Sequence, residues 1–160
     1  FEPGMIEEIE YPAEVRRLLG EFDVEVDDDE LNRFLEAEHA AWRPACRLAS
    51  TTHALLESLR ERGLKLGLVS NAFDPADLLH RDLAEMGVAE RLDVAVFSSA
   101  VGRRKPDPLI FEEALGRLGV APERGLFVGD TLATEIAGAA ARGTVSGRGG
   151  RPSSRGGRGA

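Results

Sequence analysis

The chain has 160 residues, a formal net charge of −8 and a hydrophobic share of 42%, values that fit one packed domain with a small insertion. No apolar stretch reaches the ~18 residues that suggest a membrane span, and the first residues do not form a basic and apolar secretory signal. The single cysteine excludes an internal disulfide. A cytoplasmic protein without a membrane partner is therefore expected.

The charge is unevenly distributed along the chain. Residues 1–42 contain fourteen acidic and three basic side chains, whereas residues 143–160 contain four arginines and no acid. An acidic body argues against nucleic-acid binding, which needs a basic surface to neutralise phosphates. The Gly/Arg-rich segment 144–160 has no apolar periodicity and is predicted to be a disordered tail.

Residues 1–50 are predicted to form a small helical unit. A first helix over about 12–19 carries Val15 and Leu18 and ends at Gly20. The acidic run 27–30 then precedes a second amphipathic helix that extends to about Cys46, because acidic side chains favour the positive end of the helix dipole.

Residues 51–143 alternate between helical and strand patterns. The predicted strands are the short apolar runs 65–71, 92–97 and 126–128. Asp74 and Asp107 each precede a proline and are predicted helix N-caps, and a last helix is expected to end at Gly143. Such alternation indicates an α/β fold of the Rossmann-like kind, with a parallel sheet and helices on both of its faces.

Ligands of such sheets bind beyond the carboxyl ends of the strands. Two predicted strands end at polar residues, Ser70-Asn71 and Gly129-Asp130, and Lys105 lies in the loop that follows the strand between them. A hydroxyl at Ser70 can donate to a phosphoryl oxygen, and an ammonium at Lys105 can offset its charge. The alternatives are a polar turn at Ser70-Asn71 and a solvated lysine beside two arginines.

Asp130 and Glu135 are the candidate metal ligands. A carboxylate at the tip of a buried strand is costly unless it is paired or binds a cation. Two carboxylates at this spacing can share one Mg²⁺, either directly or through a water molecule. The competing interpretation is that Asp130 caps the helix that follows it.

Three segments, taken in order, resemble the motifs of the haloacid-dehalogenase-like (HAD) hydrolase superfamily. They are LGLVSN (66–71), GRRKPDPLIFEEAL (102–115) and GLFVGDTLATEIAGAAARG (125–143). The resemblance implies that Ser70 and Asn71 contact the phosphoryl group, that Lys105 steadies its charge and that Asp130 binds Mg²⁺. Glu135 stands where family members often have aspartate. Residues 1–50 would then be a cap on the α/β core 51–143.

The first motif of the family, an Asp-x-Asp after a buried strand, is absent from the sequence. Asp27-Asp28-Asp29 has the letters, but it follows no apolar strand and is predicted to start a helix. The chain is therefore expected to be a fragment without the nucleophilic aspartate, inactive alone. The missing strand would lie between those predicted at 65–71 and 126–128, and its absence would leave unpaired backbone groups and favour aggregation.

Three functions remain open from the sequence. The favoured one is a Mg²⁺-dependent phosphatase that acts on a small phosphate ester through an aspartyl-phosphate. A 2-haloacid dehalogenase is the alternative within the family, although such enzymes typically have Ser-Asn where this chain has Gly129-Asp130. Outside the enzymes, the chain could be a non-catalytic binding remnant that holds RNA through its Arg/Gly tail.

Overall fold

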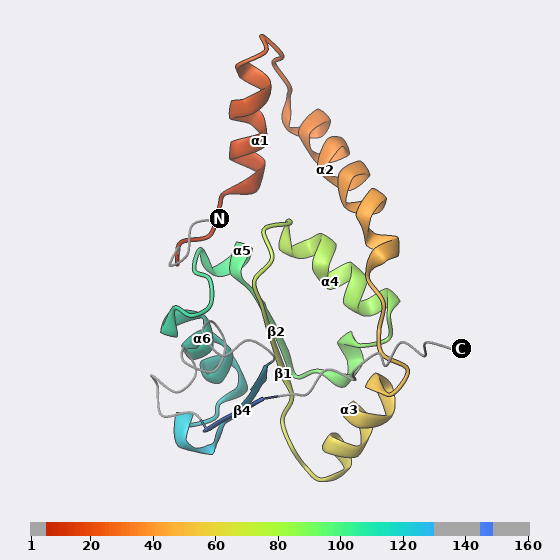
Figure 1. Ribbon diagram of the computed structural model, residues 1–160, viewed down its shortest axis with the longest axis vertical. Helices are drawn as coiled ribbons and strands as arrows, with labels where there is room; N and C mark the ends of the chain where they lie inside the picture. Colours follow the sequence, from red (N-terminus) through yellow and green to blue (C-terminus); the bar gives the residue numbers. More distant parts are fainter. Residues whose placement is uncertain (1–5, 130–144, 149–160) are drawn as a thin grey trace, which may run out of the picture.

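The computed structural model describes residues 6–129 and 145–148 of the chain. Helices α1 and α2 stand at one end of the molecule, and the strands with the other helices form the opposite end (Figure 1). In chain order the elements are α1 (Tyr11–Gly20), α2 (Asp28–Trp42), α3 (Thr52–Glu61), β1 (Gly67–Ser70), α4 (Ala76–Glu85), β2 (Val94–Phe97), α5 (Ser98–Val101), α6 (Pro108–Leu118), β3 (Leu126–Gly129) and β4 (Val145–Arg148).

The two cap helices pack against each other through an apolar cluster of their own. Val15 of α1 is buried against Leu31 and Leu35 of α2, and every other apolar side chain packed on this cluster also comes from residues 11–26. Helix α2 begins where the acidic run predicted it, because Asp27 accepts a bond from the Glu30 amide and Glu30 bonds back to the Asp27 amide. Asp27-Asp28-Asp29 is thus a helix start.

The core is built on the parallel pair β1 and β2, whose register runs from Gly67 opposite Val94 to Ser70 opposite Phe97. Helix α6 covers one face through a cluster that buries Val96 with Ile110, Phe111 and Ala114. Helices α3 and α4 lie on the opposite side of the pair (Figure 1). The predicted α/β class, with parallel strands between helices, is confirmed.

Strand β3 belongs to a second parallel pair, with β4 as its partner from Leu126 opposite Val145 to Gly129 opposite Arg148. β4 falls within the segment 144–160 that was predicted to be disordered, and that prediction is wrong for residues 145–148. Their backbone groups pair with β3, a contact that composition alone does not reveal. The helix predicted to end at Gly143 lies outside the described residues.

One of the two predicted Asp-Pro caps is confirmed. Asp107 accepts a hydrogen bond from the Leu109 amide at 2.9 Å, and Pro108 is the first residue of α6. The prediction for Asp74 is wrong, because α4 begins at Ala76 without a side-chain cap. The Asp74 carboxylate instead points to a buried histidine of helix α2. This contact stabilises a buried carboxylate more than a hydrogen bond from a backbone amide at the start of α4 would.

None of the described helices is both long enough and apolar enough to cross a bilayer.

Candidate active site

Ser70 and Asn71 lie at the carboxyl end of β1, in the place predicted for a ligand-binding edge. Ser70 is the last residue of β1 and is half-buried. Asn71 begins the loop that leads to α4. Because all four residues of β1 pair with β2, the hydroxyl of Ser70 is carried by a strand of the sheet and not by a loop.

The side-chain amide of Asn71 holds the backbone of Lys105. Its Oδ1 accepts a bond from the Lys105 amide at 2.7 Å, and its Nδ2 donates to the Lys105 carbonyl at 3.2 Å. These two bonds connect the end of β1 to a loop 34 residues further along the chain. Asn71 was predicted to contact substrate, but its amide group is engaged in positioning Lys105.

The ammonium group of Lys105 is buried beside the end of β1. Lys105 is only 8% exposed, and its Nζ donates to the carbonyl oxygen of Val69 at 3.1 Å. The same Nζ lies 5.8 Å from the ring centre of Phe127 on β3. Residues on both sides of Ser70 therefore contact Lys105, so the lysine lies at the carboxyl end of β1, where Ser70 is the last residue.

Local bonds fix the turn that carries Lys105. The Asp107 amide donates to the Arg104 carbonyl at 2.8 Å, and Asp107 then caps α6. The Lys105–Pro106 peptide bond is cis. The lysine is thus held from its own loop as well as by Asn71, and the alternative of a freely solvated lysine is wrong because its side chain is buried.

A segment that precedes the cap helices buttresses this loop from the other side. Residues Glu7 and Arg103 form an antiparallel bridge, and the Arg104 amide donates to the Ile6 carbonyl at 2.7 Å. The Glu8 side chain is 1% exposed and forms an ion pair with Arg104. It also accepts bonds from the Ser98 hydroxyl and, at 2.8 Å, from the Ile9 amide.

Sequence reasoning missed this buried carboxylate. Glu8 is one of several acids near the N-terminus, and its partners Ser98 and Arg104 are about 90 residues away. No local pattern distinguishes it from its exposed neighbour Glu7. The sequence offers no signal for the pairing of Glu8 with Arg104, which are 96 residues apart.

A cavity of about 760 Å³ separates β1 from β3. It is lined by Gly67 and Val69 of β1, by 126–128 of β3 and by apolar residues of α6. Neither Ser70 nor Lys105 lines it, so it lies beside the strands and apart from the end of β1 that carries Ser70. Among the described residues β1 pairs only with β2, and β3 only with β4.

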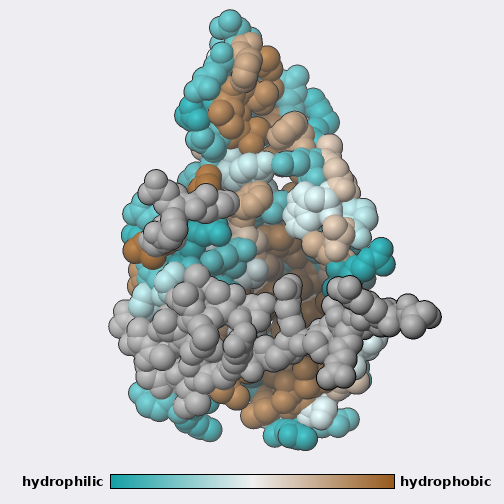
Figure 2. All heavy atoms as spheres, viewed as in Figure 1, coloured by the Kyte–Doolittle hydropathy of each residue, from teal (hydrophilic) through white to brown (hydrophobic). Residues whose placement is uncertain are grey.

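Apolar side chains on β3 remain exposed next to this cavity. Leu126 is 66% exposed and Val128 is 61% exposed, although both belong to a strand with a fully apolar sequence. Figure 2 shows apolar surface on the lower part of the core, and a separate apolar area over the helical cap. Leu126 and Val128 thus form an exposed apolar face on β3 among the described residues.

The predicted magnesium ligands Asp130 and Glu135 lie outside the described residues. Asp130 directly follows Gly129, the last residue of β3, and the ring of Phe127 on the same strand faces Lys105. Within residues 6–129 and 145–148, no three His, Cys, Asp or Glu side chains are grouped closely enough to hold a metal.

The sequence and the fold can be compared with those of known proteins. The family model for haloacid dehalogenase-like hydrolases matches residues 3–143. The chain is 41% identical over 91 residues to glyceraldehyde 3-phosphate phosphatase of Methanopyrus kandleri, which covers 57% of the chain and 38% of that protein. It is 40% identical over 86 residues to phosphoserine phosphatase of Thermus thermophilus, covering 54% and 34%.

A solved structure gives the same result. The crystal structure of a HAD phosphatase from Thermococcus onnurineus superposes with a TM-score of 0.64 and 28% identity, covering 86% of this chain and 60% of that one. The matches span little more than a third of the length of the curated relatives. Because the family model covers most of the sequence, the chain belongs to the haloacid dehalogenase-like hydrolase family.

Proposed function

We propose that this chain supplies the phosphoryl-binding part of a phosphatase site that acts on a small phosphate ester. The observation that carries the proposal is the placement of Lys105. Its backbone is held by the amide of Asn71, and its buried ammonium donates to the carbonyl of Val69, the residue before Ser70. The relatives named as phosphatases support the choice of a phosphate ester over a haloacid.

Each residue has a distinct task in this proposal. The Ser70 hydroxyl donates a hydrogen bond to a non-bridging phosphoryl oxygen. The Lys105 ammonium offsets the negative charge of the phosphoryl group, and it does so strongly because it is screened from water. Asn71 contributes indirectly, by keeping the lysine backbone at a fixed position relative to β1.

Asp130 and Glu135 are the residues that would hold Mg²⁺. Carboxylate oxygens are the hard ligands that this ion prefers, and Asp130 directly follows the end of β3, the strand whose Phe127 ring faces Lys105. The donor set therefore fits the ion. When bound there, Mg²⁺ would offset charge on the phosphoryl oxygens.

The nucleophile is the missing part of this site. In the proposed reaction an aspartate carboxylate forms a bond to phosphorus while the bond from phosphorus to the ester oxygen breaks and the alcohol leaves. Water then hydrolyses the aspartyl-phosphate to release phosphate. The sequence contains no Asp-x-Asp after an apolar strand, so we place the nucleophile on a further strand between β1 and β3 and expect the 160 residues alone to be inactive.

Binding of inorganic phosphate tests the proposal without requiring turnover. The purified chain is titrated with phosphate in the presence of MgCl₂, with folding checked by circular dichroism. Lys105→Met should weaken phosphate binding about tenfold or more. The matched control is Lys65→Met, because Lys65 is the only other lysine and is more exposed.

The outcomes are distinguishable. If the wild-type chain does not bind phosphate, or if both lysine variants bind as it does, the phosphoryl-binding assignment fails. Hydrolysis of p-nitrophenyl phosphate is measured in parallel and should be absent. Hydrolysis by the wild-type chain that is lost in Asp130→Asn would overturn the claim that the nucleophile is missing. It would leave the assignment of phosphate binding in place.

A further inference from the structure

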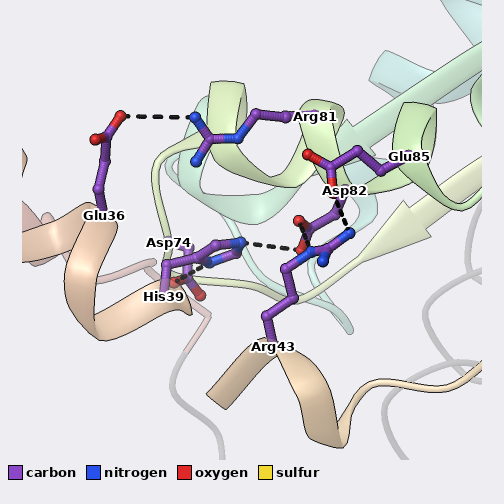
Figure 3. Close-up of polar contacts among 7 residues, drawn as sticks. All are labelled: Glu36, His39, Arg43, Asp74, Arg81, Asp82 and Glu85. Carbon is purple, nitrogen blue, oxygen red and sulfur yellow. Dashed lines mark hydrogen bonds and ion pairs between the residues drawn. The ribbon is translucent and has the colours of Figure 1, made fainter. Parts of the chain in front are cut away.

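A cluster of buried charged side chains joins the helical cap to the core. His39 of α2 is 1% exposed, and its two ring nitrogens face two carboxylates. Nδ1 lies 3.1 Å from Asp74 Oδ1, and Nε2 lies 2.9 Å from Asp82 Oδ2. Both carboxylates are more than 90% buried. Figure 3 shows the imidazole between them, with Asp74 in the loop after β1 and Asp82 on α4.

The number of hydrogen-bond donors in this cluster indicates which form of His39 can bond both carboxylates. A carboxylate can only accept hydrogen bonds, and a neutral imidazole carries a single N–H. Two simultaneous bonds to ionised Asp74 and Asp82 therefore require the imidazolium form, in which both nitrogens donate. That form also supplies a positive charge between two buried negative ones, which would otherwise be costly to bury.

The other groups around the imidazole balance the remaining charge. Arg43 forms ion pairs with Asp82 and with Glu85 of α4, and the pKa of Arg43 is raised first by its bond to Asp82. The Trp42 ring meets the imidazole edge at 4.8 Å. Other charged or titratable groups nearby include the pair Glu36–Arg81, the pair Tyr11–Glu38 and the thiol of Cys46 beside Arg43.

This polar cluster is the principal described contact between helix α2 and the core. The apolar cluster that joins α1 to α2 has its buried residues in these two helices. Its Tyr11, on α1, packs edge-on against Phe73, next to Asp74, with ring centres 4.8 Å apart. The seating of α2 on the core therefore depends mainly on charges and hydrogen bonds, which respond to pH.

We propose that protonated His39 holds the cap against the core through its two hydrogen bonds, so that the contact between cap and core weakens when this imidazole loses its proton. Neutral His39 can donate to Asp74 or to Asp82 but not to both, which leaves one buried carboxylate without its donor. Asp74 lies three residues after Asn71. The bond from His39 to Asp74 therefore connects the cap to the loop that begins with Asn71, the residue that holds the backbone of Lys105.

The sign of the effect follows from which form makes the contacts. The imidazolium makes both bonds, so its contribution is present where His39 is protonated, at lower pH, and is lost where the ring is neutral, at higher pH. Both carboxylates must be ionised to accept hydrogen bonds from His39. The pH dependence of the contact is therefore measured above the range in which aspartates usually titrate.

Hydrogen exchange of the full chain tests the proposal. Protection factors of the α2 amides near His39 are measured from about pH 5.5 to about pH 8.5, with the α6 amides as an internal reference. We expect protection in α2 to fall by about tenfold or more across this range, the loss of one charge-assisted hydrogen bond, while α6 changes much less. The ¹⁵N shifts of the imidazole should show both nitrogens protonated at the acidic end.

Asp74→Asn is the decisive variant. An asparagine amide can donate to Nδ1 while Nε2–H donates to Asp82, so a neutral histidine satisfies both neighbours and the pH dependence of α2 should largely disappear. His53→Gln is the matched control, because His53 is exposed and bonds only the Met86 carbonyl in the described part of the chain; it should behave as wild type.

Two results would overturn the proposal. One is a wild-type α2 whose protection does not change over the pH range. The other is an Asp74→Asn variant that loses protection with pH as wild type does. Neither measurement depends on phosphate binding or turnover, so failure here is separate from failure of the proposed function.

Discussion

The side-chain amide of Asn71 bonds both the amide and the carbonyl of Lys105, at 2.7 and 3.2 Å. One side chain thus fixes the position of a buried lysine whose ammonium lies against the Val69 carbonyl. An amide donates through its nitrogen and accepts through its oxygen at the same time, whereas aspartate in its place could satisfy only one of the two backbone groups and leucine neither.

Replacing Asn71 should therefore affect both stability and anion binding. Asn71→Leu leaves the two backbone groups of Lys105 without partners and should cost ~2–4 kcal/mol of unfolding free energy. It should also weaken phosphate binding, since the lysine is no longer held. Urea denaturation and a phosphate titration measure the two effects. Asn32→Leu, on the exposed face of α2, is the control and should change neither by much; equal losses in both variants would contradict the positioning role.

Glu8 and Glu7 form a matched pair of neighbours with opposite environments. The Glu8 carboxylate is buried with Arg104 and Ser98, whereas the Glu7 side chain is 77% exposed beside Arg103. Glu8→Gln should destabilise the chain by ~2–4 kcal/mol, because it leaves a guanidinium with a neutral partner in a buried place. Glu7→Gln should cost less than ~0.5 kcal/mol. Equal denaturation midpoints for the two variants would show that the Glu8 contact carries little stability.

Tyr11 is the only tyrosine, so its ionisation can be followed by absorbance without interference. Burial raises the pKa of Tyr11 to about 12, with further contributions from the bond to Glu38 and from the charges of Glu38 and Asp74. The folded state favours the neutral phenol, so its contribution to stability is complete below the unfolded value of about 10 and is lost as pH rises toward 12. Glu38→Gln should shift the transition downward. A wild-type midpoint near 10 would show that the phenol is solvated.

Adjacent side chains of β3 lie in different surroundings, so their substitution should affect stability to different extents. Leu126→Thr and Val128→Thr alter side chains that are more than 60% exposed, and each should cost less than ~1 kcal/mol while reducing self-association of the chain. Phe127→Ala removes a ring that meets Phe111 at 5.0 Å and should cost ~2–4 kcal/mol. Light scattering and urea denaturation measure these effects. If the threonine variants associate as strongly as wild type, the exposed strand is not what drives association.

Much of the architecture was predictable from the sequence alone. The alternation of short apolar runs with amphipathic stretches determined the α/β class, and Asp107-Pro108 determined the start of α6. Ser70 and Lys105 could be chosen as candidates because the carboxyl ends of parallel strands gather at one edge, and the structure brings Lys105 against both neighbours of Ser70. These features are encoded within a few residues of each other, where periodicity and capping chemistry act.

Only the tertiary structure decided which partners the buried charges have. The same Asp-Pro pattern gave a helix N-cap at Asp107 but a bond to His39 at Asp74. The carboxylate of Asp74 is buried where helix α2 passes over it, so it meets the histidine. Glu8 and Asn71 likewise find partners 34 to 96 residues away. Contacts between distant segments leave no local pattern, since they are set by how whole elements pack and by the cost of burying a charge without a partner.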